Sequence, residues 1–234
     1  MKTVENPAAK LSRLGTITTA WAKSAQSQFE LTRRQKPPQY IRYQSYKRYL
    51  RAEFEQKCIY CRSPDSVHPN DHKTYAVEHY WPKEHFPERE CDYDNLFYAC
   101  SMCNAYKDDY WPRSENEPFS PNPCHHVMTE HVRFVDGEVV AGSAHGAFMA
   151  ETLQLNDEAL VAWRKAHMWT IGALEAEVTN LRSLKKKVRK KVAQCGGKLD
   201  VDRDLADIDA KIEQHEATLD CYCGTTLTGY AAGA

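Results

Sequence analysis

The stretch from Cys58 to Lys107 decides the organisation of this chain. It contains Cys58-Ile59-Tyr60-Cys61, Val77-Glu78-His79-Tyr80-Trp81-Pro82-Lys83, Asp94-Asn95-Leu96, and Cys100-Ser101-Met102-Cys103-Asn104-Ala105-Tyr106-Lys107. Two C-x-x-C pairs therefore enclose a carboxylate–histidine dipeptide and an asparagine. Four thiolates from two such pairs suit one tetrahedral Zn²⁺. The sequence predicts that zinc closes the intervening chain into a loop and clamps its shape.

We expect this zinc ion to be structural, because four thiolates fill the tetrahedron and leave no position for water. The alternative of four unrelated buried thiols fits poorly, since paired C-x-x-C motifs in a reducing compartment indicate metal or redox chemistry. A thioredoxin-like role would need one C-x-x-C on a βαβ frame, and this chain carries two pairs.

In order and spacing, these motifs resemble the HNH nucleases, a superfamily with a ββα-metal fold. The resemblance rests on Glu78-His79 before x-x-Pro-Lys, on Asp-Asn-Leu around Asn95, and on Cys-x-x-Cys-Asn-x-x-Lys ending at Lys107. The combination also resembles the HNH subunit of Septu-type anti-phage systems, which works beside an ATPase. The resemblance implies a metal-dependent endonuclease that hydrolyses phosphodiester bonds in DNA, with RNA not excluded, as the effector of a defence complex.

The same resemblance implies roles for four residues. His79 would be the general base that deprotonates the attacking water. Glu78 and Asn104 would give hard oxygen ligands to a catalytic Mg²⁺ or Mn²⁺. Asn95 would support the site by hydrogen-bonding the backbone of the loop that carries His79. Asn104 stands where the commonest family pattern has a second histidine.

Two lysines are weaker candidates for binding nucleic acid. Lys107 lies on the same helical face as Asn104, where its amine would either contact a phosphate or be solvated. Lys83 is a similar candidate with less support. The alternative function is a non-catalytic zinc-ribbon module that binds nucleic acid or protein, and such a module has no need of Glu78, His79 and Asn104 together.

Composition limits the partners and the compartment. The 234 residues carry a net charge of −1. Any binding of nucleic-acid phosphates must therefore come from local positively charged patches or from a protein partner. The chain shows no apolar run of membrane-spanning length and no signal peptide, which predicts a cytoplasmic protein without membrane contact. Nine cysteines in that compartment indicate metal ligands and free thiols rather than disulfides.

The predicted fold class is α+β and mostly helical, with a ββα-metal core stapled by the zinc site and followed by a long antiparallel helical hairpin. Four segments are expected: a polar, partner-dependent segment at 1–38, the nuclease domain at 39–155, the hairpin at 156–222 and a tail at 223–234. Within them the patterns predict helices at 14–29, 40–56, 100–111 and 147–155, a strand at 74–79, and a β-hairpin turning at Asp136-Gly137.

The hairpin prediction rests on apolar residues at steps of three and four in both arms. Asn156 is the expected N-cap, Gly196-Gly197 the expected turn, and the tail from Gly224 is expected to be disordered. The basic run 185–191 faces an acidic arm, 200–209, so we expect ion pairs rather than DNA binding. A wide apolar stripe leaves room for a partner, either an ATPase of the same operon or a second copy. Cys124, His125, His126 and His131 are expected to pack beside the core, and Cys221 and Cys223 receive no role.

Overall fold

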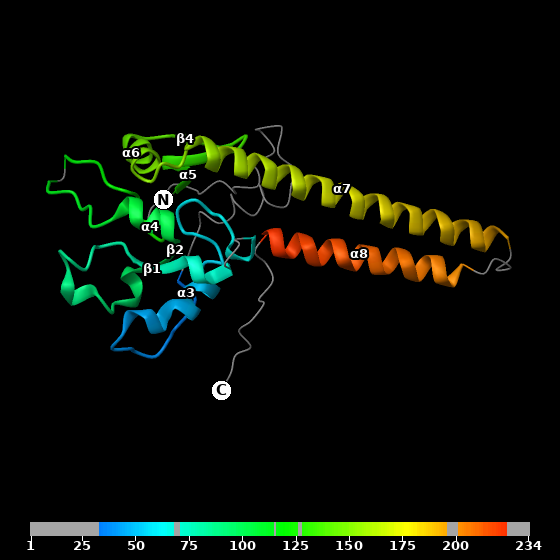
Figure 1. Ribbon diagram of the computed structural model, residues 1–234, viewed down its shortest axis with the longest axis horizontal. Helices are drawn as coiled ribbons and strands as arrows, with labels where there is room; N and C mark the ends of the chain where they lie inside the picture. Colours follow the sequence, from blue (N-terminus) through cyan, green and yellow to red (C-terminus); the bar gives the residue numbers. More distant parts are fainter. Residues whose placement is uncertain (1–32, 68–70, 115, 126–127, 196–200, 224–234) are drawn as a thin grey trace, which may run out of the picture.

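The computed structural model describes residues 33–67, 71–114, 116–125, 128–195 and 201–223 (Figure 1). The predicted helix at 14–29, the Gly196-Gly197 turn and the tail from Gly224 lie outside these ranges. The described chain is α+β, with two small antiparallel sheets and a long helical hairpin that projects from one side of the molecule. Within the described ranges, no helix is both long and apolar enough to cross a bilayer.

The chain reaches the first cysteine pair through a short helical segment. A 3-10 turn, η1 (Tyr43–Tyr46), leads into α3 (Lys47–Glu53), so the helix is shorter than the predicted 40–56. Tyr46, Leu50 and Phe54 are buried on one face, as their three- and four-residue spacing indicates. Short 3-10 turns follow at η2 (Asp65–Val67) and η3 (Asp71–Thr74).

The central unit is an antiparallel strand pair followed directly by a helix. Strand β1 (Tyr75–His79) pairs with β2 (Leu96–Cys100), and α4 (Ser101–Lys107) begins where β2 ends. Two 3-10 turns, η4 (Pro87–Arg89) and η5 (Tyr93–Asn95), lie in the connection between the strands. The helix ends at Lys107 instead of residue 111, because Asp108 adopts a left-handed φ of 49° that breaks the helical path.

A second hairpin joins this unit to the C-terminal helices. After α5 (Met128–His131), strands β3 (Val132–Val135) and β4 (Glu138–Ala141) turn through Asp136 and Gly137, whose φ values of 47° and 79° suit a two-residue hairpin turn. The turn prediction is confirmed. Helix α6 (Ala144–Thr152) begins earlier than predicted because the Ser143 hydroxyl caps it, accepting from the Gly146 amide at 3.1 Å.

The helical hairpin consists of α7 (Glu158–Gln194) and α8 (Asp202–Cys223), which lie side by side (Figure 1). Asp157 caps α7 by accepting from the amides of Ala159 and Leu160. The predicted cap, Asn156, is wrong by one residue. Its amide instead makes two hydrogen bonds with the backbone of Val139, at 2.7 and 2.8 Å, and so ties β4 to the start of α7.

Apolar and charged contacts hold the two arms together. Val178 and Leu181 of α7 form a small buried cluster with Ile208 and Ile212 of α8. This apolar contact between the two arms, called the seam below, confirms the predicted packing of the hairpin. Lys185 pairs with Asp209 across the arms, and Arg182 pairs with Glu216. The end of α8 returns to the central unit, where the Cys221 carbonyl accepts a hydrogen bond from the Ser66 hydroxyl of η2.

Candidate functional site

The four cysteines of the two C-x-x-C pairs converge on one point. Their Sγ atoms all lie within 4.8 Å of one another, and each residue is 6% exposed or less. The Cys61 and Cys100 sulfurs are 3.8 Å apart. Zn–S bonds of about 2.3 Å in a tetrahedron place sulfurs about 3.8 Å apart, so the spacing fits a zinc ion. Among the described residues, this is the one group of three or more cysteine, histidine or acidic side chains with metal-binding spacing.

The electrostatics of this cluster also fit a cation at its centre. Hydrogen bonds from Cys100, Cys103 and Cys58 hold the pKa of Cys61 well below its usual range, while the hydrogen bond with Cys100 raises the pKa of Cys103. The four thiols therefore cannot all ionise without a positive ion between them. A divalent cation would let all four act as thiolates, and the resulting centre would carry two net negative charges.

Two buried arginines lie in the field of that centre. Arg62 and Arg164 are both fully buried, and burial lowers the pKa of each guanidinium, an effect that the nearby cysteines oppose. Arg164 donates to the Leu155 carbonyl, yet its Nε and Nη1 have no hydrogen-bond partner among the described residues. A buried cation needs a nearby anion, and a tetrathiolate zinc centre supplies one.

Glu78 lies on β1 in a buried polar cluster. Its Oε1 is 2.9 Å from the Lys107 ammonium and accepts a hydrogen bond from the Tyr60 hydroxyl at 2.8 Å. Lys107 also donates to the His79 carbonyl at 2.8 Å, so one ammonium ties α4 to two consecutive residues of β1. Burial raises the pKa of Glu78, and the Lys107 charge acts in the opposite direction.

His79, at the end of β1, is held in one orientation. Its Nε2 lies 3.0 Å from the Glu90 carbonyl, and its ring packs edge-on against Tyr43 with 4.6 Å between centroids. Because a carbonyl only accepts, the proton lies on Nε2 and the lone pair on Nδ1. Burial lowers the pKa of His79, and the Lys83 charge acts in the same direction. At neutral pH this imidazole is an uncharged base with a defined tautomer.

Asn95 holds two segments of the connection that follows His79. Its Oδ1 accepts from the Trp81 amide at 2.7 Å, and its Nδ2 donates to the carbonyls of Trp81 and Arg89 at 3.0 and 3.1 Å. Trp81 follows His79 by two residues, and Arg89 precedes the Glu90 carbonyl that orients the imidazole. The fully buried Asn95 amide therefore positions both the strand end and the acceptor of His79.

Lys107 is buried instead of facing water, whereas the structure leaves the prediction for Lys83 open. Lys107 is 4% exposed and engaged with Glu78 and His79, so it neither contacts a phosphate nor is solvated. The helical spacing correctly puts it one turn beyond Asn104, but that face of α4 packs on β1 rather than facing water. Lys83 is half-buried, with its amine 5.3 Å from the centre of the Tyr43 ring.

A hydrated Mg²⁺ or Mn²⁺ does not fit Glu78 as the side chain stands. Carboxylate and amide oxygens are the donors these ions prefer. However, Glu78 is buried, and its Oε1 is already shared by Lys107 and Tyr60. Asn104 is half-buried on α4 and, within the described part of the chain, takes no part in the hydrogen bonds around Glu78. We therefore assign no reaction step to a second metal.

The remaining cysteines and histidines do not form a second metal group among the described residues. Cys124 is half-buried, His125 is exposed, and His131 bonds the Ser143 hydroxyl at 2.7 Å. His126 lies outside the described residues. Cys221 contacts Ser66, and Cys223 is a buried free thiol at the end of α8.

Sequence reasoning missed three residues of this site. Glu90 contributes only its backbone carbonyl, which any residue would supply, so no side-chain pattern could identify it. Tyr60 lies inside the first cysteine motif at a position that the motif leaves free. Arg164 comes from α7, far along the chain. The one available signal was its helical spacing of seven residues from Ile171, which places it on the buried face of α7.

Comparison with known proteins adds no assignment. No family model matches this chain, and no match was found among curated proteins or solved structures.

Proposed function

We propose that this chain is an HNH-type endonuclease that hydrolyses phosphodiester bonds, with DNA as the substrate and RNA as the alternative. The observation that carries the proposal is the orientation of His79, whose Nε2 lies 3.0 Å from the Glu90 carbonyl so that the Nδ1 lone pair is left to act as a base. Burial lowers the pKa of this imidazole, which favours the same role. His79 lies on a β1–β2–α4 unit beside a four-cysteine cluster, which is the order of elements that the sequence resemblance implies.

The residues of the chain can carry out the first proton transfer. His79 Nδ1 accepts a proton from a water molecule, and the resulting hydroxide attacks phosphorus. The bond between phosphorus and the 3′ oxygen breaks, and the leaving 3′ oxygen takes a proton from solvent water. The Glu90 carbonyl stabilises the imidazolium that forms, because it accepts from Nε2–H in both protonation states. Glu78 and Lys107 hold the strand end, and Asn95 holds the loop, so the imidazole needs little rearrangement. Cys58, Cys61, Cys100 and Cys103 would hold a zinc ion that clamps this unit without taking part in the chemistry.

The test is cleavage of supercoiled plasmid by the zinc-loaded full chain with Mg²⁺, Mn²⁺ or a chelator. His79→Ala is expected to lower the rate by about 10²–10⁴-fold, the usual contribution of a general base. His85→Ala is the matched control, since His85 is half-exposed and contacts Asp109 instead of the site. Equal cleavage by His79→Ala and the parent would remove the basis of the proposal. Comparing Mg²⁺, Mn²⁺ and chelator also tests whether cleavage needs a second metal, the ion that Glu78 and Asn104 are predicted to hold.

The rival function, a zinc-ribbon module that binds without cutting, makes a different prediction. Such a module would bind nucleic acid or protein with zinc present and leave plasmid intact under every metal condition. The burial of both Glu78 and Lys107 is compatible with this rival, whereas the oriented, uncharged His79 favours hydrolysis.

We also propose that the helical hairpin serves assembly, as the Septu resemblance implies. Trp169 on α7 is 76% exposed, and Leu184 is 46% exposed, so apolar surface remains on the arm outside the seam. The proposed partner is an ATPase of the same operon, and a second copy of this chain is the alternative. Sizing and pull-down with Trp169→Glu, compared with Thr179→Glu on an exposed position of the same helix, distinguish these outcomes from a monomer.

A further inference from the structure

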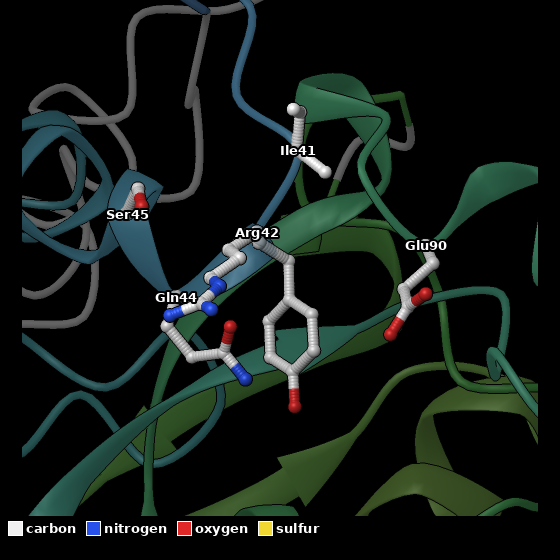
Figure 2. A pocket seen from close by; sticks show the side chains of 6 residues that line it. Ile41, Arg42, Gln44, Ser45 and Glu90 are labelled. Atoms are coloured by element: carbon white, nitrogen blue, oxygen red, sulfur yellow. The ribbon is translucent and has the colours of Figure 1, made fainter.

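A surface pocket of about 670 Å³ lies at the start of η1 (Figure 2). It is lined by Ile41, Arg42, Tyr43, Gln44, Ser45 and Glu90. Ile41 and Arg42 directly precede η1, Tyr43, Gln44 and Ser45 lie in η1, and Glu90 comes from the connection between β1 and β2. None of them belongs to the motifs that carry the family resemblance.

Two lining residues place the pocket next to the candidate base. Tyr43 packs edge-on against the His79 ring at 4.6 Å, and Glu90 holds His79 Nε2 through its carbonyl at 3.0 Å. The Lys83 amine lies 5.3 Å from the centre of the ring of Tyr43, one of the residues that line the pocket. The pocket and the imidazole therefore share Tyr43 and Glu90 as neighbours.

The lining supplies hydrogen-bond donors and one flexible cation. In the view of Figure 2, Arg42 and Gln44 lie on one side of the pocket and the Glu90 carboxylate lies on the other. Arg42 is exposed, and the parallel N–H donors of its planar guanidinium can bond both free oxygens of a phosphodiester. The Gln44 amide and the Ser45 hydroxyl can bond sugar and phosphate oxygens without reading a base. Ile41, 98% exposed, adds an apolar surface at the rim.

We propose that this pocket binds the nucleic-acid backbone next to the phosphate that His79 attacks, with Arg42 gripping the neighbouring phosphate. This inference rests on the proposed function, since it names how that site takes its substrate. The contact is sequence-independent, because the pocket offers groups for phosphate and sugar. Arg42 supplies a positive charge at one side of the pocket, whereas the chain as a whole has a net charge of −1.

Salt dependence of binding tests this contact directly. Each neutralised phosphate of duplex DNA contributes about 0.9 to the slope of log K against log salt, and about 0.7 for a single strand. The parent for the assay is zinc-loaded His79→Ala, which binds without cutting, and the probe is a labelled duplex measured by fluorescence anisotropy. Adding Arg42→Ala should weaken binding to unrelated sequences equally and lower the slope by about 0.9. Arg42→Lys should restore the slope but not the full affinity, because an ammonium lacks the planar fork.

Arg48→Ala is the matched control. Arg48 is also exposed and lies six residues away, but its guanidinium donates to the Tyr40 and Tyr49 hydroxyls and does not line the pocket. An unchanged slope in Arg42→Ala, an equal fall in Arg48→Ala, or no salt-dependent binding by the parent would each overturn the inference. If the slope falls while the active chain leaves plasmid uncut, the pocket stands and the nuclease proposal fails. If the active chain cuts plasmid and Arg42→Ala leaves both KM and slope unchanged, the pocket alone fails.

Discussion

Replacing Lys107 by methionine isolates the buried ion pair that joins α4 to β1. The substitution keeps most of the side-chain volume and removes the ammonium, which lies 2.9 Å from Glu78 Oε1 and 2.8 Å from the His79 carbonyl. Both Lys107 and Glu78 are 4% exposed, so water cannot replace the lost charge. The carboxylate would keep its hydrogen bond from Tyr60 and lose its counter-ion.

Breaking a buried pair in this way costs about 3–5 kcal/mol, because the surviving charge stays desolvated. Glu78 can limit that loss by taking up a proton. Burial already raises the pKa of Glu78, and removing Lys107 raises it further, since the Lys107 charge acts to lower it. The folded state then binds more protons than the unfolded state, so stability falls as pH rises from the unfolded pKa of Glu78 to its folded pKa. The deficit of the variant relative to the parent should therefore be larger at pH 8 than at pH 5.5.

The assay is urea unfolding of the zinc-loaded chain at both pH values. Lys165→Met is the matched control, since Lys165 is 45% exposed and lies 3.8 Å from Glu138 and 3.9 Å from Asp136. Loss of such a surface pair costs under about 1 kcal/mol. Adding Glu78→Gln to Lys107→Met should recover part of the loss at pH 8. A Lys107→Met variant no less stable than Lys165→Met would refute the reasoning.

Three further predictions follow from the same geometry. Cys100→Ser should lower the zinc content from one ion per chain and unfold the central unit, measured by metal analysis and circular dichroism; a zinc-free, stably folded parent would contradict the assignment. Asn95→Ala should cost about 1–3 kcal/mol for each backbone group left unsatisfied near His79, measured by unfolding, and an unchanged unfolding midpoint would contradict the positioning role. Arg164→Met should speed the loss of zinc to a chelator, whereas Arg182→Met on the exposed face of α7 should not; equal rates would show that the Arg164 charge does not support the zinc centre.

Patterns that depend on short-range geometry could be predicted from the sequence. The cysteine spacing predicted a four-sulfur cluster, because a C-x-x-C turn brings its own two thiols together and leaves only the meeting of the two pairs to the fold. The Asp136-Gly137 turn and the seam of the helical hairpin were predictable for the same reason, since φ preference and helical periodicity act over a few residues. The family resemblance implied that Asn95 hydrogen-bonds the backbone of the loop that carries His79. In the structure its partners there are the Trp81 amide and the Arg89 carbonyl.

Tertiary structure alone decided which charges are buried and what faces them. Lys107 has the helical position that the sequence predicts, but only the packing of α4 on β1 places its amine against Glu78. The tautomer of His79 depends on the Glu90 carbonyl, a backbone atom that no residue pattern encodes. Arg164 feels the charge of the cysteine cluster because the first part of α7 shares the main apolar core with the four cysteines, although the two segments are far apart in the chain. Local propensities are properties of short segments, whereas burial and electrostatic partners arise when distant segments exclude water between them.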